Sequence, residues 1–334
     1  MKSNFIYVPI IKWKQGEQGA LKELNDSVKD SIIPLIEITP DLNFSKFKNS
    51  LDNWENKNFY FDVMPEVYEE NDGEIYFDLL KQCNPDFVIP VVFISDDKDA
   101  IVEAVRYSNN GIAIRISSND FEDLEDSLIK LGNIIDYKNI DLIIDLKEVN
   151  ERNFSEKKII IKALMPDIPN IQSFRNIIIS SSAFPQSLSN FEKYKIHYIN
   201  RYDYQLWSSL HTLENKYNIK LVYSDYCVNH PSFLEYIPGM TPSFNIRYTA
   251  DNSFIVIRGD STKKGGLDNK NVIALCNKLI ELDDYSGLDF SWGDNYIFTR
   301  NSDKITGCGN LSIWRKVGTN HHITFVINQI SSLS

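Results

Sequence analysis

Short apolar runs recur along the first 225 residues of the chain, and segments with helical spacing of apolar residues separate them. The run Ile32–Ile38 shows the pattern: it is apolar except for Glu37 near its end, and Thr39-Pro40 stops it. A strand without polar alternation needs both of its faces covered, as in the parallel sheets of α/β proteins. The sequence therefore predicts a parallel sheet with helices packed on it.

The alternation of strand and helix repeats eight times. The expected strands are 5–13, 32–38, 59–63, 87–94, 112–116, 140–146, 177–182 and 221–225. The expected helices lie around 20–28, 44–51, 76–83, 100–107, 121–131, 157–165 and 204–217, the last of them displaced by a long connection through 184–201. Eight such units over roughly 230 to 250 residues have the usual size of a (β/α)8 TIM-like barrel. Its strands close on each other and leave no edge.

An open, doubly wound sheet is the main alternative to the barrel. Such sheets usually carry a glycine-rich first turn that binds the phosphates of a dinucleotide. The first turn of this chain, Lys12–Gly16, has a single glycine. The barrel is therefore favoured.

The pattern changes after residue 225. The expected elements are a β-hairpin of 244–249 and 253–258 turning at Asp251-Asn252 and a helix 271–282. A stretch rich in Gly and Asp, 287–309, then precedes a segment 311–317 and a last helix through Ile330 capped by Asn320. No long linker separates these elements from the barrel. We therefore predict one domain over 1–334, with core strands in 5–225 and the hairpin and C-terminal helical segment, 244–330, at the barrel mouth.

Composition excludes several classes of protein. With 43% hydrophobic residues among 334, the chain can bury a large core, so a disordered protein is excluded. A formal charge of −11 argues against general nucleic-acid binding, which needs a basic face. No apolar run has the length of a membrane span and no signal peptide is apparent, so a cytoplasmic protein is predicted. The four scattered cysteines and the adjacent His321-His322 lack the spacing of metal ligands, so no metal site is assigned.

Charged residues lie at or near the ends of the expected barrel strands. They are Lys12, Glu37, Asp62, Arg115, Asp145 and Asp225. In barrels of this kind, functional side chains gather at the C-terminal ends of the strands. Acids and bases brought together there would shift each other's pKa values, as functional sites do. The alternative is that these residues form structural ion pairs or a solvated rim.

Several short segments resemble the phage beta-protein family. They are Tyr7–Glu17 with Ala20-Leu21, Pro34–Ile38, Asp225-Tyr226, Arg247–Thr249, Arg258-Gly259, Trp314-Arg315 and Gly318–His322. Members of that family are phage proteins and proteins of bacterial mobile or defence-associated gene neighbourhoods, with no settled reaction. The resemblance implies a shared site among the polar and aromatic positions of these segments: Lys12, Glu37, Arg247, Tyr248, Arg258, Trp314, Arg315 and His322.

The first functional hypothesis is a component of a phage–host conflict, or antiphage defence, system. It would act through the polar site at the barrel mouth or through a surface for a protein partner encoded in the same operon. The aromatic residues suited to anchor a partner are Tyr236, Tyr248, Trp292, Tyr296 and Trp314. The alternative role of these rings is to cover the barrel end or to fill its core.

The second functional hypothesis is a hydrolase or phosphodiesterase, metal-dependent or metal-free, acting on a nucleotide or another phosphorylated small molecule. Lys12, Arg115, Arg247 and Arg258 would hold the anion, because guanidinium groups bind phosphate oxygens bidentately. The acidic candidates Glu37, Asp62, Asp145 and Asp225 would serve as general base or hold a divalent ion. No cofactor is identified from the sequence, and it leaves open whether the protein is an enzyme.

Overall fold

The computed structural model describes residues 6–70, 74–233, 242–261, 268–300 and 307–333. Phe5 and Tyr236 lie outside these ranges. The chain divides into two compact units. The barrel unit comprises Met1–Trp13, Ser31–Ala183 and Tyr202–Tyr226, and the second unit comprises Lys14–Asp30, Phe184–Arg201 and Cys227–Ser334. The single domain over 1–334 stays a prediction.

The barrel unit contains a closed barrel of eight parallel strands, as predicted. In ring order they are β1 Tyr7–Lys12, β2 Leu35–Ile38, β3 Phe59–Val63, β4 Val88–Phe93, β5 Ile112–Ile116, β6 Ile140–Glu148, β7 Asn176–Ser182 and β9 Leu221–Asp225. The pairing of β9 with β1, which sets Tyr7 beside Tyr223, closes the ring. Lys12 lies opposite Glu37, and Glu37 lies opposite Asp62.

The inward faces of the strands change from apolar to polar along the chain direction. A buried inner layer consists of Val8, Ile10, Ile33, Leu35, Tyr60, Ile89, Val91, Ala113, Ile143, Ile178, Val222 and Tyr226. Glu37, Asp62 and Arg115 each come two residues after a member of this layer. Because side chains alternate with a period of two, these polar groups point inward as well, at the C-terminal ends of their strands.

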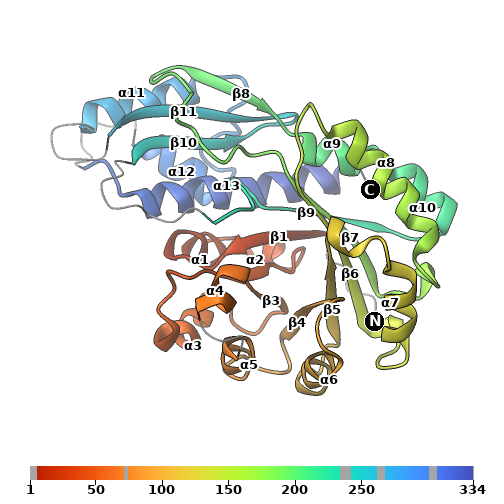
Figure 1. Cartoon of the computed structure of the whole chain (residues 1–334). Helices are drawn as coiled ribbons and strands as arrows, with labels where there is room; N and C mark the ends of the chain where they lie inside the picture. Colours follow the sequence, from red (N-terminus) through yellow and green to blue (C-terminus); the bar gives the residue numbers. More distant parts are fainter. Residues whose placement is uncertain (1–5, 71–73, 234–241, 262–267, 301–306, 334) are drawn as a thin grey trace. The chain divides into compact units, whose positions relative to one another are not determined.

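Helices cover the outside of the barrel strands (Figure 1). They are α3 Phe47–Ser50, α4 Pro65–Glu70, α5 Ile75–Leu80, α6 Lys98–Tyr107, α7 Leu124–Gly132, α8 Phe154–Leu164, α9 Tyr202–Ser208 and α10 His211–Tyr217. Their aromatic residues bond to strand carbonyls: Tyr76 donates to the oxygen of Val91 at 2.7 Å, and Trp207 donates to that of Leu221 at 3.0 Å. These bonds fix α5 and α9 against the barrel.

The second unit combines an antiparallel sheet with helices. Its strands, in sheet order, are β10 Ser243–Thr249, β11 Ser253–Ser261 and β8 Ile196–Asn200. Its helices are α1 Gln15–Lys22, α2 Asp26–Lys29, α11 Asn269–Ile280, α12 Trp292–Thr299 and α13 Leu311–Ser331. Side chains of β10, β11, α11, α12 and α13 share one buried core. The predicted hairpin of β10 and β11 is confirmed.

Strand β8 corrects the sequence analysis, which placed a connection through 184–201. Ile196–Asn200 pairs antiparallel with β11, so that Ile196 lies opposite Ile257. The strand is short and at the edge of its sheet, and its partner lies more than fifty residues away in the chain. A local sequence pattern does not indicate a pairing between strands that are so far apart in the chain.

The C-terminal helix gives a second correction. Leu311–Ser331 is one continuous helix, so Asn320 lies in its interior and does not cap a separate helix. The amide of Asn320 accepts a hydrogen bond from Gly293 N at 3.0 Å and donates one to the Ala20 carbonyl at 3.1 Å. An amide at this position therefore joins α13 to α12 and α1. The preceding stretch, to which the sequence analysis assigned no element, contains α12.

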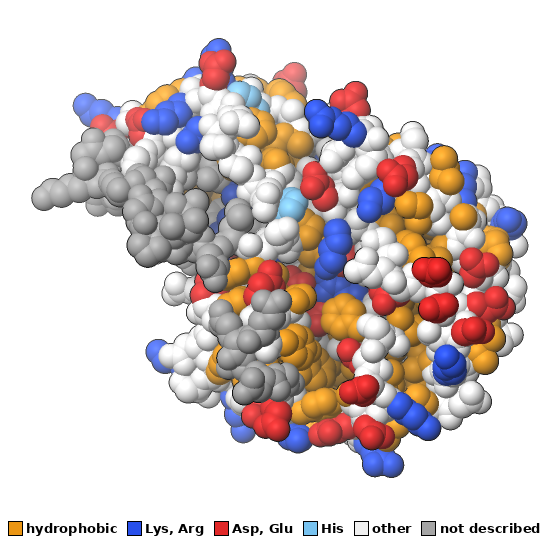
Figure 2. All heavy atoms as spheres, viewed as in Figure 1, with side chains coloured by type: hydrophobic (Ala, Val, Ile, Leu, Met, Phe, Trp, Pro, Cys, Tyr) orange, Lys and Arg blue, Asp and Glu red, His pale blue; other side chains and the backbone are white. Residues whose placement is uncertain are grey.

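Acidic and basic side chains are mixed on the face drawn in Figure 2. Aspartate and glutamate outnumber lysine and arginine by 46 to 35 in the sequence, which gives the formal charge of −11. Among the described residues, no helix combines the length and the apolar character needed to cross a membrane.

Candidate functional site

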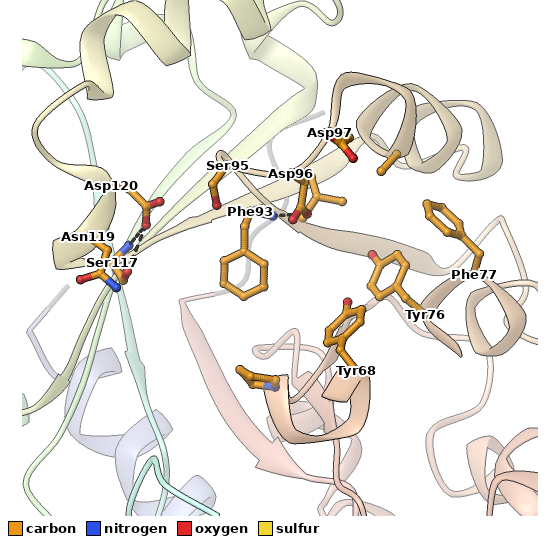
Figure 3. A pocket seen from close by; sticks show the side chains of 13 residues that line it. Tyr68, Tyr76, Phe77, Phe93, Ser95, Asp96, Asp97, Ser117, Asn119 and Asp120 are labelled. Carbon is orange, nitrogen blue, oxygen red and sulfur yellow. Dashed lines mark hydrogen bonds between the residues drawn. The ribbon is translucent and has the colours of Figure 1, made fainter. Parts of the chain in front are cut away.

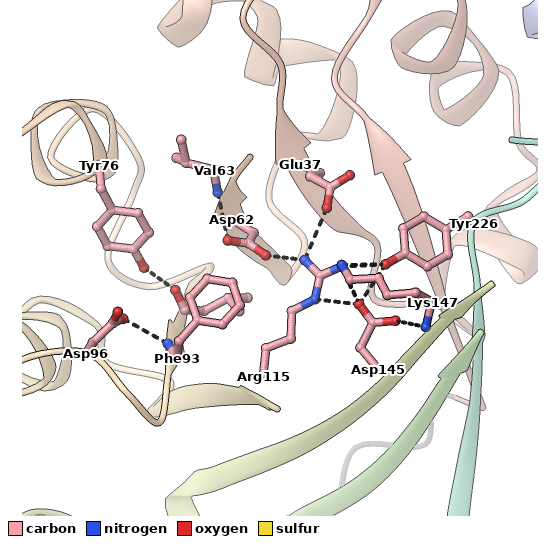
Figure 4. Close-up of polar contacts among 11 residues, drawn as sticks. Glu37, Asp62, Val63, Tyr76, Phe93, Asp96, Arg115, Asp145, Lys147 and Tyr226 are labelled. Carbon is pink, nitrogen blue, oxygen red and sulfur yellow. Dashed lines mark hydrogen bonds and ion pairs between the residues drawn. The ribbon is translucent and has the colours of Figure 1, made fainter. Parts of the chain in front are cut away.

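Arg115 stands at the centre of a buried polar network inside the end of the barrel (Figure 4). Its Nε and Nη2 both donate to Oδ2 of Asp145, at 3.0 and 2.7 Å. Its Nη1 donates to Glu37 Oε1 at 3.1 Å and to Asp62 Oδ2. The side chains of β2, β3, β5 and β6 therefore meet at one guanidinium. The sequence prediction that these four residues lie together at the strand ends agrees with this geometry.

Two further side chains complete the network. Tyr226 donates its hydroxyl hydrogen to Asp145 Oδ2 at 2.7 Å and accepts from Arg115 Nη2 at 2.6 Å. Lys147 Nζ lies 2.8 Å from Asp145 Oδ2 and 3.1 Å from the Tyr226 oxygen. The side chain of Lys147 is 51% exposed, whereas that of Asp145 is fully buried. Lys147 is thus the member of the network that reaches solvent.

Burial and charge move two carboxyl groups in opposite directions. Burial raises the pKa of Asp62 to about 6, with the negative charge of Glu37 acting in the same direction and Arg115 against it. Burial would also raise the pKa of Asp145, but Lys147 and Arg115 outweigh it and hold that pKa below its ordinary value. Asp62 is therefore the carboxyl group of this network that can change its protonation near neutral pH.

Some buried polar atoms of the inner face have no hydrogen-bond partner in the described part of the chain. They include Glu37 Oε2 and the hydroxyl oxygens of Ser180 and Ser224. Ser180 and Ser224 lie opposite each other in β7 and β9, two residues after members of the inner layer. Buried polar atoms cost free energy unless they are bonded. The inner face therefore has capacity for further polar contacts at the strand ends.

A pocket of about 640 Å³ opens beside this network, at the ends of β3, β4 and β5 (Figure 3). It is lined by Pro65, Tyr68, Tyr76, Phe77, Val92, Phe93, Ser95, Asp96, Asp97, Ala100, Ser117, Asn119 and Asp120. The rings of Tyr68 and Tyr76 stack, with centroids 6.3 Å apart and planes at 18°. The lining residues include four aromatic rings and three aspartates but no lysine, arginine or histidine.

The pocket and the network influence each other electrostatically. Burial raises the pKa of Tyr68 and Tyr76, and the charge of Asp62 raises both further. Figure 4 shows the ring of Phe93 between Asp62 and the side of the pocket formed by Tyr76 and Asp96. Asp96 accepts a hydrogen bond from the Phe93 backbone at 2.8 Å, which holds this strand end in place. A molecule in the pocket would therefore lie within the field of Asp62.

Lys12 and Asp225, the two remaining predicted residues of the barrel unit, lie on opposite faces of the barrel strands. Lys12 is 9% exposed and lies beside Glu37 in the strand register, on the inward face. Asp225 follows Ser224 and so faces the outside of the barrel ring. It accepts hydrogen bonds from Tyr7 at 2.5 Å and from Tyr223 at 2.8 Å. Asp225 is thus not brought together with Arg115.

The other predicted residues belong to the second unit, where Arg247 and Arg315 converge. Both donate to the carbonyl oxygen of Val228, at 2.6 and 3.3 Å. Arg258 is bound elsewhere on the sheet, to Ser243 Oγ at 3.0 Å and to the Ser189 carbonyl at 2.7 Å.

Three predicted residues are packed in the interior of the second unit. Tyr248 and Trp314 are 0% and 4% exposed and belong to its hydrophobic core. His322 is buried, and its Nδ1 lies 2.8 Å from Thr249 Oγ1. Of the other aromatic candidates, Trp292 and Tyr296 are partly buried against the same core. These rings pack in or against the core of the second unit, whereas the alternative role considered for them was to cover the barrel end or to fill the barrel core.

Sequence reasoning missed Lys147, Tyr226 as part of the network, and the pocket. Lys147 comes two residues after Asp145, so the alternation would have placed it on the same face. Its left-handed backbone, with φ of 57°, has no sequence signal because lysine rarely adopts it. The pocket residues come from β4 and from the helices and turns that follow β3, β4 and β5, and only the folded barrel brings them together.

A closed (β/α)8 barrel with a buried polar network and a pocket at the ends of its strands defines the class of this protein. The profile of the beta protein family matches residues 7–328, and the chain belongs to that family. No curated protein matches the sequence at a significant level.

Proposed function

We propose that this beta-family protein takes part in phage–host conflict by binding a small polar molecule in the pocket at the ends of β3, β4 and β5. The observation that carries the proposal is the pocket itself, about 640 Å³ in volume and adjacent to the Arg115 network. Ligand sites of barrels lie at this end of the strands, and pockets of this volume suit small molecules. The biological setting rests on the resemblance to the family.

The lining favours a neutral or cationic ligand that carries a flat ring. Stacked and tilted aromatic side chains offer faces to a ring or a cation, and the three aspartates accept hydrogen bonds. A phosphate group would meet carboxylates without a cationic side chain in the lining. Arg115, the buried cation at the centre of the adjacent network, already uses Nε, Nη1 and Nη2 on carboxylates and Tyr226. The phosphorylated ligand expected from the sequence is therefore not favoured in this pocket.

A hydrolase is the second candidate, and the specific observation that favours it is Asp62. A carboxyl group with a pKa near 6 is suited to exchange protons at neutral pH. Binding in the pocket would exclude water and strengthen the interactions of Asp62 with its neighbours. This candidate function requires that the reacting group of the ligand displace the Phe93 ring and reach Asp62, which then acts as general acid or base, with Arg115 and Glu37 as positioning residues.

Thermal denaturation in the presence of ligand panels tests the binding function. The panels are nucleosides, monosaccharides and aromatic amines, with nucleoside phosphates for comparison. A ligand at a hundred times its dissociation constant should stabilise the protein by about 2.7 kcal/mol. Tyr68→Ala and Asp96→Asn should each reduce this stabilisation, and the exposed Asp126→Asn of α7 is the matched control. Stabilisation that is equal in all four proteins would contradict the proposal.

Conversion of a bound ligand tests the hydrolase candidate. The ligand is incubated with wild type and with Asp62→Asn, and its mass is followed over time. Conversion by wild type and loss of conversion in Asp62→Asn, with ligand affinity retained, would support catalysis. An unchanged ligand in both samples would leave binding as the function and reject the hydrolase.

A further inference from the structure

The second unit holds two arginine side chains in direct competition for the same acceptors. Arg247 Nη1 donates to the Val228 carbonyl at 2.6 Å, and Arg315 Nη1 donates to the same oxygen at 3.3 Å. Both Nη1 groups also reach Asn229 Oδ1, that of Arg247 at 3.5 Å. Two positively charged groups therefore share one backbone carbonyl and one side-chain amide as hydrogen-bond acceptors, and both acceptors are neutral.

Negative charge near the arginine pair is insufficient to balance it. Arg247 bonds to Asn245 Oδ1 at 2.9 Å and lies over the ring of Phe184, and none of its partners among the described residues is a carboxylate. Glu17 lies 3.6 Å from Arg315 Nε and is the carboxylate of the cluster. Burial raises the pKa of Glu17, although the charge of Arg315 opposes this. Burial therefore disfavours the ionised form of Glu17, the form that would balance the arginines. The pair therefore carries an excess of positive charge.

Desolvation makes this excess charge unfavourable. Burial lowers the pKa of Arg247 well below its ordinary value, and the charge of Arg315 lowers it further, although the charge of Glu17 opposes both. Burial also lowers the pKa of Arg315. A guanidinium remains a cation in proteins, so the shift expresses repulsion and lost hydration of a charge that stays. An anion placed between the two groups would remove both penalties.

Each arginine also keeps one donor group available. The hydrogen bonds of Arg247 and Arg315 within the described ranges use Nε and Nη1, and none uses Nη2. The Arg315 side chain is 27% exposed, so the pair can be reached from solvent. Adjacent guanidinium groups with unused N–H donors are the arrangement that binds phosphate oxygens.

Close backbone packing holds the two arginines in position. A Cβ atom on Gly318 of α13 would lie 2.8 Å from the carbonyl oxygen of Arg247. A Cβ atom on Gly16 of α1 would lie 2.9 Å from Cβ of Arg315 and 2.6 Å from the Ser312 carbonyl. Glycines therefore let β10, α13 and α1 approach each other where the arginines are attached. Such preorganisation lowers the entropic cost of binding.

We propose that Arg247 and Arg315 form an anion site that binds a phosphate group, either free or on a small molecule. The site lies wholly in the second unit and goes beyond the pocket function proposed for the barrel. Glu17 moderates the charge of Arg315, and Phe184 supports the plane of Arg247 from one face.

Isothermal titration calorimetry at constant ionic strength tests this site. Inorganic phosphate and adenosine 5′-monophosphate are the two titrants. Arg247→Met and Arg315→Met remove one charge each with little change in length, and Arg152→Met, at an exposed position of the barrel unit, is the matched control. Wild type and the control should bind at least one titrant equally well, and each of the other two variants should lose about tenfold or more in affinity. Binding of the nucleotide alone would identify a phosphate ester as the ligand.

Two results would overturn the site. One is that wild type binds neither titrant, and the other is that Arg247→Met and Arg315→Met bind as wild type does. Circular dichroism checks that each variant is folded. Should a methionine variant fail to fold, Arg247→Lys and Arg315→Lys replace it; the lost guanidinium fork should weaken binding, and unchanged affinity rejects the proposal. Tyr68→Ala separates this inference from the barrel function, because it should leave phosphate binding unchanged.

Discussion

Arg115 donates through both Nε and Nη2 to a single carboxylate oxygen, Oδ2 of Asp145, at 3.0 and 2.7 Å. This leaves Nη1 for the carboxylates of Glu37 and Asp62. One guanidinium therefore neutralises acids from three other strands. The barrel end depends on this residue for its charge balance.

Replacing Arg115 by methionine should destabilise the barrel strongly. Removing one partner of a buried ion pair leaves an uncompensated charge, which costs about 3–5 kcal/mol. Here three carboxylates lose their shared cation. Urea denaturation at neutral pH measures the free energy of unfolding.

Arg175→Met is the control for this prediction. Arg175 bonds a single buried carboxylate, Asp141, at 2.8 and 2.5 Å. Its loss should cost less than that of Arg115, and the cost of both should shrink as acid protonates the carboxylates. A smaller loss for Arg115→Met than for Arg175→Met would contradict the central role of Arg115.

Asp62→Asn should change how stability depends on pH. The pKa of Asp62 is about 6 in the folded protein against an ordinary 3.8, so the folded state binds more protons between these values. Stability of wild type therefore falls as pH rises from about 4 to 6, by about 3 kcal/mol from this group. The variant lacks this loss, and its stability relative to wild type should increase over the same range. Urea denaturation at several pH values checks this, and parallel curves would show that the Asp62 pKa is not raised.

The alternation of strands and helices made the inner network predictable in large part. Glu37, Asp62, Arg115 and Asp145 each lie near the end of an apolar run, and parallel strands place their C-terminal ends on one side. Asp225 ends the run Leu221–Asp225 in the same way but faces outward, because its neighbour Ser224 occupies the inward position. A run that is apolar on both faces does not reveal which face is inward.

Contacts between distant segments were the part that the sequence could not predict. The hairpin of β10 and β11 is local and carries its own turn residues, whereas β8 pairs with β11 across the chain. The convergence of Arg247 and Arg315 likewise depends on the packing of β10 on α13. In the sequence, only the resemblance of their two segments to the phage beta-protein family suggested that Arg247 and Arg315 belong to one site.

Asp294→Asn should destabilise the second unit above pH 4. Asp294 Oδ2 lies 2.8 Å from Nδ1 of the buried His321, and Asp294 also accepts from Tyr248 at 2.7 Å. Burial would raise the Asp294 pKa, but His321 outweighs it and the pKa is lowered. The carboxylate therefore contributes stability above its ordinary pKa near 3.8, and this is lost as pH falls further.

The expected cost of Asp294→Asn is about 2–3 kcal/mol at neutral pH, because a hydrogen bond to a charged group contributes about 1.5–3 kcal/mol and the Asp294 carboxylate accepts from both His321 and Tyr248. Tyr248→Phe removes one hydrogen bond of the same cluster and should cost about 1 kcal/mol. Thermal and urea denaturation measure both. A cost of Asp294→Asn that is no larger than that of Tyr248→Phe would mean that the contact between Asp294 and His321 adds no stability.

Two glycines of α1 should respond in opposite ways to replacement by alanine. In a helix interior, alanine is favoured over glycine by about 1 kcal/mol. A Cβ atom on Gly16 would lie 2.6 Å from the backbone oxygen of Ser312, which cannot move without shifting α13. A Cβ atom on Gly19 would meet the flexible side chain of Lys316, its closest atom at 3.0 Å.

Gly16→Ala should therefore destabilise the protein by about 1–3 kcal/mol, while Gly19→Ala should be neutral or stabilising. Urea denaturation of both variants checks the prediction, and equal effects would show that α1 does not pack on α13 as closely as these distances require.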